Sequence, residues 1–464
     1  MGQPFSLYDT RRRGVFPLEP LLPGRLGIYT CGPTVYGSPH IGNYRTYIAQ
    51  DVLVRALTQA AYQVNRVMNV TDVGHLTSDA DEGEDKLQLS AEREATTAWD
   101  IAARYEAEFL ADLDALGIIL PTHLVRATDT ISEQIALIQQ LEAKGYTYQT
   151  ADGLYYDSAK FASYPDFARL DLAGQQAGSR VAVGDKRNPS DFALWKFSPP
   201  DKKRDMEWES PWGRGFPGWH LECSAIALRE LGPELDIHCG GVDHIPVHHT
   251  NEIAQSEAAT GQPLARHWFH TDFLLVDDTK MSKSIGNLYT LADLRNRQVD
   301  LRAFRLFVYS ASYRAKLNFT WEGLAAAERS LERLRSLAQS GGEGSEQATL
   351  YLERFDAALA DDLNVPAALA VVWELLRAPL QPAERHRAVV HVDAVLALDL
   401  YREPAQVEIS TLPSELQQLI AQRIEARATQ DWATSDSLRE QLARAGYGVE
   451  DTQAGQRVKK VTEP

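Results

Sequence analysis

Two short segments of this sequence carry side chains suited to holding a polyphosphate. In the first, His40-Ile41-Gly42-Asn43, two polar side chains three residues apart stand where a helix is expected to begin. A helix N-terminus attracts anions, and the glycine leaves room for a nucleotide to approach the backbone. In the second, residues 280–284 (Lys-Met-Ser-Lys-Ser), two lysines with serine hydroxyls beside them form a compact clamp for a polyanion. The alternatives are a helix cap in the first segment and an exposed turn in the second.

A further group of side chains has the chemistry of a metal site. Cys31 follows an expected strand, and Cys223 follows an aromatic and acidic run. His248 and Glu252 stand at i and i+4 of an expected helix, so both project from one face. Zinc accepts two thiolates, an imidazole and a carboxylate in a tetrahedral set. The alternative is that the two cysteines, which are far apart in the sequence, are small buried hydrophobic residues.

These groups need a sheet with loops at one edge to position them. The alternating pattern of residues 26–30 predicts a strand, the apolar face of 48–60 predicts a helix, and 64–70 predicts a second strand. This βαβ unit predicts a parallel, doubly wound sheet. The sheet is expected to resume with a strand at 235–238 and a helix from about 248 to 260.

The rest of the chain is expected to be helical or irregular. The acidic stretch 77–95 is interpreted as a solvated loop rather than a metal site, 96–145 as helical and 186–219 as irregular. Beyond 290 the pattern is almost entirely helical. A Gly/Ser linker at 340–345 interrupts it, and a last helical pair at 413–445 ends in a short β-like tail.

The composition restricts the class of protein. The chain has 464 residues, about three domains at roughly 150 residues each. With 44% hydrophobic and 24% charged residues, wholesale disorder, collagen and a disulfide scaffold are excluded. We expect no membrane span and no secretory signal, and the three cysteines predict a reducing, cytoplasmic setting. The net charge of -17 argues against nonspecific coating of nucleic acid, but local contacts with a folded RNA remain open.

The ordered pair of phosphate motifs resembles the HIGH and KMSKS signatures of class I aminoacyl-tRNA synthetases, although the first here reads HIGN. Four longer segments resemble one family of that class, the cysteinyl-tRNA synthetases. They are residues 31–36 (Cys-Gly-Pro-Thr-Val-Tyr), 218–224 (Gly-Trp-His-Leu-Glu-Cys-Ser), 248–256 (His-His-Thr-Asn-Glu-Ile-Ala-Gln-Ser) and 310–322 (Ser-Ala-Ser-Tyr-Arg-Ala-Lys-Leu-Asn-Phe-Thr-Trp-Glu). The similarity extends from about residue 6 to 458, nearly the whole chain.

The resemblance implies an α/β fold. A class I Rossmann-type doubly wound parallel sheet would carry an insertion and be followed by mostly α-helical C-terminal domains. The implied boundaries are 1–115 for the first half of the catalytic domain, 116–218 for the connecting insertion, 219–290 for the second half with the zinc site and the KMSKS loop, 291–339 for a helical stem-contact region, 346–410 for a helical bundle and 411–464 for the anticodon-binding region.

The resemblance also implies an activity, the ATP-dependent activation of L-cysteine to cysteinyl-adenylate and its transfer to the 3′ end of tRNA(Cys). The implied ligands are one Zn²⁺ per subunit, held by Cys31, Cys223, His248 and Glu252, and ATP with Mg²⁺ as substrate. A substrate thiolate bonded to zinc would separate cysteine from serine. A site that requires a specific bond rejects the analogue lacking it by about 10⁴–10⁵. The enzyme is expected to be a cytoplasmic monomer that contacts no membrane.

The other site residues implied by the family form four groups. Catalysis is expected to use His40, Asn43, Lys280 and Lys283; ATP binding to use Pro33, Gly42, Met281, Ser282, Lys283 and Ser284; the amino-acid pocket to use Thr71, Trp219, His238 and Asp243; and anticodon binding to use Arg427, Trp432, Asp436 and Asp451. Trp219 would cover the substrate, and Asp243 would hold its α-ammonium group. Trp432 would stack on an unpaired base, while carboxylates would accept from guanine, the first base of the cysteine anticodon. For both tryptophans the alternative is packing in a core or between helices.

The sequence departs from the family pattern in four places. Asn43 replaces the second histidine of HIGH, and Thr250 replaces a residue that is not a ligand. Residues 73–76 (Val-Gly-His-Leu) stand where the family has two more acids and a lysine, which puts any role of those acids in doubt. Cys239 places a third thiol near the pocket, as a packed residue or a spare ligand.

Two other functions fit parts of this pattern. A related ligase that adenylates cysteine and passes it to the amine of a sugar resembles the catalytic core but lacks an anticodon region, so residues 413–458 favour the synthetase. The other is an RNA-binding regulatory paralogue without catalysis. The complete motif at 280–284 and the complete set of zinc ligands argue against it.

Overall fold

The structure, a computed structural model, describes residues 4–73, 85–170, 186–199, 204–282, 285–339, 347–401, 409–452 and 455–460. The chain forms two compact units. One consists of Met1–Leu331 and Ser340–Leu398, and the other of Glu332–Gln339 and Asp399–Pro464. Within the described residues, no helix combines the length and the apolar character needed to cross a membrane.

A five-stranded parallel sheet forms the centre of the first unit. Its strand order is β11-β10-β3-β4-β5, and every neighbouring pair is parallel. The strands are β3 (Arg25–Thr30), β4 (Gln63–Val70), β5 (His123–Arg126), β10 (Leu235–Gly241) and β11 (Ala265–Thr271). Every residue of β10 is buried, as expected of a strand that is covered on both faces. The predicted fold class and the predicted βαβ unit are confirmed.

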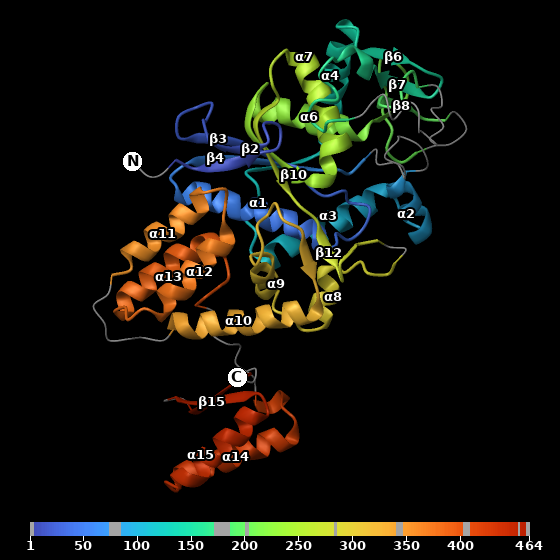
Figure 1. The fold of residues 1–464 in the computed structure, drawn as a ribbon. Helices are drawn as coiled ribbons and strands as arrows, with labels where there is room; N and C mark the ends of the chain where they lie inside the picture. Colours follow the sequence, from blue (N-terminus) through green and yellow to red (C-terminus); the bar gives the residue numbers. More distant parts are fainter. Residues whose placement is uncertain are drawn as a thin grey trace. The chain divides into compact units, whose positions relative to one another are not determined.

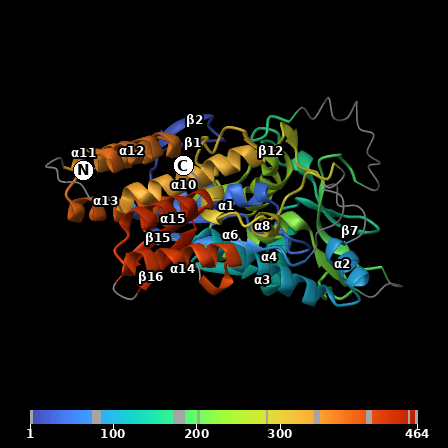
Figure 2. The same ribbon diagram turned by 90° about the horizontal axis from the view of Figure 1, so that it is seen from below.

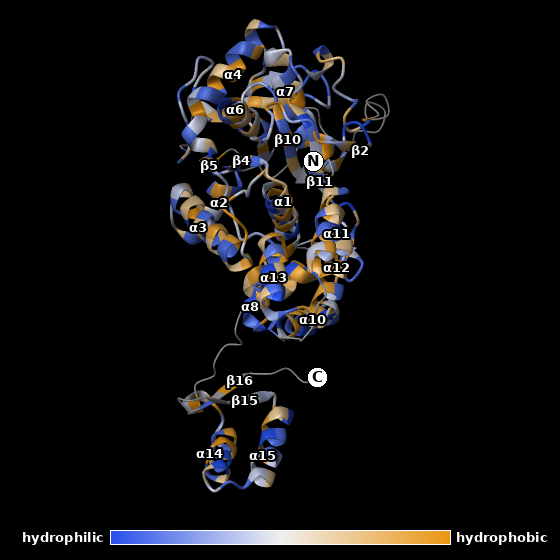
Figure 3. Cartoon of the chain, turned by 90° about the vertical axis from the view of Figure 1, so that its left-hand side faces the viewer, coloured by the Kyte–Doolittle hydropathy of each residue, from blue (hydrophilic) through white to orange (hydrophobic). Residues whose placement is uncertain are grey.

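Helices cover both faces of this sheet (Figure 1). α1 (Ile41–Gln59) joins β3 to β4 on one face, while α6 (Trp219–Leu231) and α7 (Thr250–Thr260) lie on the other. Hydrophobic residues are concentrated around α6, α7 and β10 (Figure 3). The helices that follow the neighbouring strands β3 and β10 lie on opposite faces. The crevice beyond the carboxyl ends of these strands is therefore a topological switch point, where open α/β sheets bind ligands.

The first helix begins at Ile41, where the first phosphate motif predicts a helix start, and the apolar face predicted from residue 48 lies within it. His40 and Asn43 form a capping box at this start. The backbone N–H of Asn43 donates to His40 Nδ1 (3.2 Å), and the backbone N–H of His40 donates to Asn43 Oδ1 (3.0 Å). The helix cap, which is the alternative for this segment, is therefore present, although the usual capping box pairs Ser or Thr with Glu or Gln.

Between β5 and β10 the chain forms a second, antiparallel sheet. Its order is β6-β7-β8-β9, with β6 (Thr147–Gln149), β7 (Gly153–Tyr156), β8 (Phe192–Phe197) and β9 (Gly215–Pro217). The interpretation of 186–219 as irregular is therefore wrong at β8 and β9. Pro, Gly and Trp around these short strands obscured their pattern.

The segment 96–145 is helical only in part. It contains α3 (Ala98–Leu116) and α4 (Ile131–Ala143), but between them β5 pairs with β4 at the edge of the central sheet. The prediction of continuous helix is wrong there because four residues are too few to show a strand period.

The acidic stretch 77–95 is not a loop throughout. α2 (Lys86–Glu94) begins after Asp85, whose carboxylate accepts from the backbone N–H of Leu87 at 2.8 Å. The loop prediction is wrong for this part, since the N-cap stabilises a helix that its polar composition did not indicate. Residues 77–84 of the stretch lie outside the described residues.

The remaining part of the first unit is mostly helical. Its helices are α8 (Leu291–Asn296), α9 (Leu301–Val308), α11 (Thr349–Ala360), α12 (Val365–Arg377) and α13 (Pro382–Leu396), and α10 (Trp321–Gln339) runs from this unit into the second. The strands β12 (Leu274–Val276), β13 (Thr279–Lys280) and β14 (Leu317–Phe319) form a small sheet, and β1 (Ser6–Asp9) and β2 (Gly14–Pro17) form a hairpin. α11 and α12 lie side by side (Figures 1 and 2). The helical character predicted beyond 290 is confirmed, while the linker predicted at 340–345 lies outside the described residues.

The second unit contains a helical pair and a hairpin. α14 (Ser414–Ala428) packs against α15 (Trp432–Arg444), and β15 (Tyr447–Thr452) pairs antiparallel with β16 (Gly455–Lys460). Buried Ile420, Leu442 and Val458 belong to its small core. The predicted helical pair with a β-like tail is confirmed.

Candidate active site and metal centre

A pocket of about 400 Å³ opens at the switch point of the central sheet. The loop after β3, the start of α1, the loop after β10 and the segment after β13 line it. Among its lining residues are Cys31, Pro33, His40, Asn43, Asp243, Met281 and Ser282. Residues expected in the metal site, the ATP site and the amino-acid pocket therefore surround one cavity.

The two phosphate motifs meet at this pocket. Gly42 lies so close to Met281 that a Cβ atom on residue 42 would be 2.4 Å from the Met281 Cε atom. The backbone N–H of Ile41 donates to the carbonyl of Tyr289 at 2.8 Å. This bond ties the chain just after the second motif to the first turn of α1.

The second motif is described only in part. Lys280 is exposed at the end of β13, while Lys283 and Ser284 lie outside the described residues. Asn287, which sequence analysis did not single out, fixes the base of this segment. Its Oδ1 accepts from the N–H of Ser282 (2.9 Å), and its Nδ2 donates to the carbonyl of Lys280 (3.3 Å).

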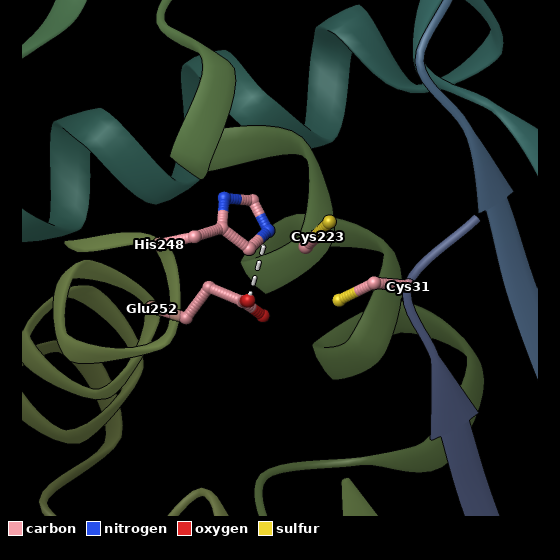
Figure 4. Close-up of side chains that lie close together, drawn as sticks. All are labelled: Cys31, Cys223, His248 and Glu252. Carbon is pink, nitrogen blue, oxygen red and sulfur yellow. Dashed lines mark ion pairs between the residues drawn. The ribbon is translucent and has the colours of Figure 1, made fainter. Parts of the chain in front are cut away.

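Cys31, Cys223, His248 and Glu252 meet in one buried cluster (Figure 4). One donor atom of each lies within 4.8 Å of the others, and none of the four is more than 5% exposed. His248 lies in a π-helical turn, Ile245–His249, that leads into α7, and its Nε2 lies 3.1 Å from Glu252 Oε1. In a tetrahedral zinc site the donors stand about 3.3–3.8 Å apart, given bonds of about 2.0–2.3 Å. Small side-chain movements would bring the cluster to that geometry.

The charges in the cluster favour a bound cation. Burial raises the pKa of Cys31 to about 11 and the pKa of Cys223 well above its usual range, so without a cation both thiols keep their protons. Burial also acts to raise the pKa of Glu252, but His238 and His248 outweigh it and hold that pKa well below its usual range. A divalent cation would supply the charge that two thiolates need. The donor set fits zinc.

Three of the four residues predicted for the amino-acid pocket lie beside the same cluster, and the fourth lines the pocket. His238 Nε2 lies 2.8 Å from Glu252 Oε2. The ring of Trp219 stands 4.8 Å from the cluster imidazole, measured between ring centroids. The hydroxyl of Thr71 donates to Glu222, beside the cluster cysteine of α6, and Asp243 lines the pocket wall.

Two buried side chains on α6 were not predicted from the sequence. His220 Nδ1 lies 2.9 Å from His248 Nδ1, so it orients the ring whose other nitrogen faces Glu252. Glu222 accepts from the amide of Asn69 at 3.3 Å, and burial raises the pKa of Glu222 to about 8. At neutral pH this carboxyl is mainly protonated.

His249 is a third functional candidate that the sequence did not indicate, and its Nε2 lies 3.3 Å from Cys31 Sγ. Burial, reinforced by nearby histidines, lowers the pKa of both His249 and His270 well below the usual range, so both rings are neutral. One signal was available, because seven of the twelve histidines of the chain lie between residues 220 and 270.

The residues predicted to read an anticodon all lie in the second unit. Trp432 is the first residue of α15 and is 55% exposed, which does not fit a packing anchor between helices. The guanidinium carbon of Arg427 lies 5.3 Å from the centroid of the Trp432 ring. Asp436 is exposed on α15, and Asp451 lies in β15. The structure thus brings together an aromatic face and a cation.

Asn43 should make a contribution to catalysis that does not vary between about pH 6 and 8, where a histidine titrates. Its Oδ1 is used in the helix cap, so its amide N–H groups remain to face ATP. Comparing the pH profiles of ATP–pyrophosphate exchange for the wild type and Asn43→His tests this. We expect one additional titration in the Asn43→His variant alone. His40 is the internal control, because it is present in both proteins and contributes equally to both pH profiles. Superimposable profiles would contradict the prediction.

Comparison with known proteins identifies the class of this chain. Residues 17–329 match the family model for the class I (C) tRNA synthetase catalytic domain. The fold is similar to that of Mycobacterium tuberculosis methionyl-tRNA synthetase in complex with methionyl-adenylate, with a TM-score of 0.56 and 17% sequence identity over 81% of this chain and 90% of that one. The fold and the match of the catalytic part define a class I aminoacyl-tRNA synthetase.

The C-terminal part identifies the family within this class. Residues 410–458 match the cysteinyl-tRNA ligase anticodon binding domain, and 354–379 match the DALR domain. The chain belongs to the cysteine–tRNA ligase family. It is 51% identical to cysteine–tRNA ligase 1 of Burkholderia lata over 98% of this chain and 97% of that protein. It is 41% identical to the cysteine–tRNA ligase of Novosphingobium aromaticivorans over 97% of this chain and 95% of that protein.

Proposed function

We propose that this chain catalyses the ATP-dependent activation of L-cysteine to cysteinyl-adenylate and transfers cysteine to the 3′ end of tRNA(Cys). The observation that carries the proposal is the pocket at the switch point, where a thiol-rich metal cluster adjoins both phosphate motifs. The 51% identity to a cysteine–tRNA ligase over nearly the whole chain supports it.

Adenylation needs little covalent chemistry from the protein. The carboxylate of cysteine attacks the α-phosphate of ATP, which is bound with Mg²⁺, and negative charge develops on the pentacovalent phosphorus and the departing pyrophosphate. Positioned donors and cations stabilise this charge. We assign this role to His40, Asn43, Lys280 and Lys283, with Pro33, Gly42, Met281, Ser282 and Ser284 shaping the ATP site. The close approach of Gly42 and Met281 supports joint binding of one nucleotide.

Cys31, Cys223, His248 and Glu252 would hold one zinc ion per subunit. When bound, zinc supplies a sulfur-preferring Lewis acid for the substrate thiol. The residues around the cluster hold the ligands in place, because His220 contacts His248 and His238 contacts Glu252. Such partners fix ring orientation and the direction of a carboxylate.

The rest of the amino-acid pocket would select the shape and charge of cysteine. Asp243 lines the pocket, and there it would accept from the α-ammonium group. Trp219, next to the cluster imidazole, would cover the side chain with a rigid apolar face. Thr71 and His238 lie beside the cluster and complete the enclosure.

The second unit would bind the anticodon of tRNA(Cys) through Arg427, Trp432, Asp436 and Asp451, and helices in 291–339 would contact the stem. The match of 410–458 to an anticodon binding domain supports this assignment. It also argues against a ligase that acts on an amino sugar, which has no such region. We further propose a monomer in the cytoplasm, where three free buried thiols stay reduced, and sedimentation would test the oligomeric state.

Cysteine-dependent ATP–pyrophosphate exchange, followed by cysteine transfer to tRNA(Cys), tests the proposed function. We expect both activities. Exchange without transfer to tRNA would favour the sugar ligase, and tRNA binding without exchange would favour a regulatory RNA-binding protein. Serine in place of cysteine is the control for selectivity.

Trp432→Ala should separate the two activities. If Trp432 stacks on an unpaired base, aminoacylation kcat/KM for tRNA should fall by the equivalent of about 1–3 kcal/mol, roughly 5–150-fold. Pyrophosphate exchange should not change, because the pocket and Trp432 belong to different units and share no partner residue. Trp432→Phe keeps an aromatic face and should recover much of the loss. If exchange is lost as well, Trp432 is a structural anchor and the anticodon assignment fails.

A further inference from the structure

We propose that a chain of three buried side chains, Thr10, His270 and His249, donates a hydrogen bond to the Cys31 thiolate and so orients it as a metal ligand. The inference rests on the proposed zinc site. It assigns a positioning role to residues outside the ligand set and outside both phosphate motifs.

The chain is continuous and comes from four separate parts of the sequence. Thr10 Oγ1 lies 2.8 Å from His270 Nδ1, His270 Nε2 lies 2.7 Å from His249 Nδ1, and His249 Nε2 lies 3.3 Å from Cys31 Sγ. All four residues are at most 5% exposed. Water therefore does not readily replace a missing link.

One contact fixes the Thr10 end of this chain, and a second fixes its middle. The backbone N–H of Thr10 donates to the carbonyl of Trp268 at 3.0 Å, which holds the threonine against β11. Gly240 on β10 lets the His249 ring approach the strand, since a Cβ atom on residue 240 would lie 2.6 Å from His249 Cε1. The imidazole thus sits in a slot that only a glycine leaves open.

The direction of every bond follows from the donors and acceptors. A thiolate can only accept, so His249 Nε2 carries the hydrogen and its Nδ1 must accept. His270 then donates from Nε2 and accepts at Nδ1, and the hydroxyl of Thr10 is the donor that completes the chain. One hydroxyl therefore selects the tautomer of two neutral imidazoles that lead to the metal ligand. Partners of this kind orient metal ligands, and their loss typically costs 10–100-fold in metal affinity.

A second arrangement uses the same residues differently. Donor atoms of Cys31, His238, His249 and Glu252 also lie within 4.8 Å of one another, so His249 itself could bind the metal. We favour the orienting role for two reasons. The first donor set offers zinc two sulfurs instead of one, and both nitrogens of His249 already have partners in the chain. A Cys223→Ser variant separates the two arrangements, because Cys223 belongs only to the first donor set.

Thr10→Val tests the proposal because it removes the hydroxyl while keeping the shape of the side chain. We expect the zinc dissociation constant, measured by competition with a chromogenic chelator, to rise about 10–100-fold. In the cobalt-substituted protein the sulfur-to-metal charge-transfer band should move to longer wavelength, because a sulfur that loses a hydrogen bond is easier to oxidise. Thr10→Ser keeps the donor and should resemble the wild type. Thr130→Val removes a buried hydroxyl that donates to Ala127 instead, and should also resemble the wild type.

The outcomes distinguish this inference from the proposed function. If the wild type binds zinc and Thr10→Val matches it in affinity and in spectrum, the inference is wrong and the zinc site stands. If the wild type binds no zinc, the zinc site and the inference both fall. If Cys223→Ser leaves the intensity of the charge-transfer band unchanged, His249 is a ligand in the second donor set and the orienting role is wrong. Should Thr10→Val fold poorly, Thr10→Ala removes the same donor with less bulk and carries the same expectations.

Discussion

Replacing both Cys223 and His248 with alanine should remove the zinc ion and, with it, the preference for cysteine over serine. Both residues are buried in the cluster, and each supplies one of four donors. The preference, expressed as the ratio of kcat/KM values in pyrophosphate exchange, should fall by ~10⁴-fold, because packing alone discriminates poorly between side chains that differ by one atom. Metal analysis of freshly purified protein should give one zinc per wild-type chain and almost none in the double variant.

Cys239→Ala is the matched control for this experiment. Its thiol is also fully buried, and burial raises its pKa to about 12, but it belongs to neither donor set. The variant should keep its zinc and its selectivity. Full zinc occupancy in the Cys223→Ala/His248→Ala protein would contradict the assigned ligand set and would point to the second set, which includes His249.

Local spacing was enough to predict one half of the buried cluster of candidate ligands. His248 and Glu252 are four residues apart, so they meet whatever the rest of the fold does. Cys31 and Cys223 are different, because only the adjacency of β3 and α6 brings them together. Sequence spacing alone left their role open, and the family resemblance was needed to join them to His248 and Glu252.

The groups that the sequence did not indicate are those whose partners are distant in the chain. His249 and His270 meet Cys31 and Thr10 only after β1, β3, β10 and β11 have assembled. No period or motif encodes such contacts. Short elements were missed for a related reason, since β5 has four residues and shows its identity only through pairing with β4.

Asp51→Asn should destabilise the first unit strongly. Asp51 on α1 and Arg305 on α9 form an ion pair in which neither side chain is exposed. Asp51 also binds Arg55 at 2.8 Å and accepts from the N–H of Ile119 at 2.8 Å. Losing one partner of a buried pair leaves an uncompensated charge, at a cost of about 3–5 kcal/mol. Urea unfolding followed by tryptophan fluorescence is the measurement. Every tryptophan except Trp432 belongs to the first unit, so the fluorescence reports mainly on the unfolding of that unit.

The pH dependence of this effect has a defined sign. Burial acts to raise the pKa of Asp51, but Arg305 and Arg55 outweigh it and hold the pKa below its usual value. The carboxylate therefore contributes its full stability above about pH 4, the usual pKa of an aspartate in an unfolded chain. This stability is lost as the pH falls through the lowered pKa of Asp51 in the folded state. The difference between the wild type and Asp51→Asn should shrink in that acidic range. Glu374→Gln, which breaks an exposed ion pair with Arg354, should leave the unfolding midpoint nearly unchanged at any pH.

A double variant, Asp51→Leu with Arg305→Met, separates the cost of an unpaired charge from the value of the pair. Replacing a buried ion pair by apolar side chains is often neutral, so the double variant should be more stable than Asp51→Asn. Arg305 also donates to the carbonyl of Leu396 at 2.8 Å, so the pair joins the helix that carries His40 to α9 and to the end of α13. If the double variant keeps its stability but loses exchange activity, the ion pair positions the helix that begins at the ATP site. If Asp51→Asn unfolds at the wild-type urea concentration, the buried charge is compensated in some other way and the prediction is wrong.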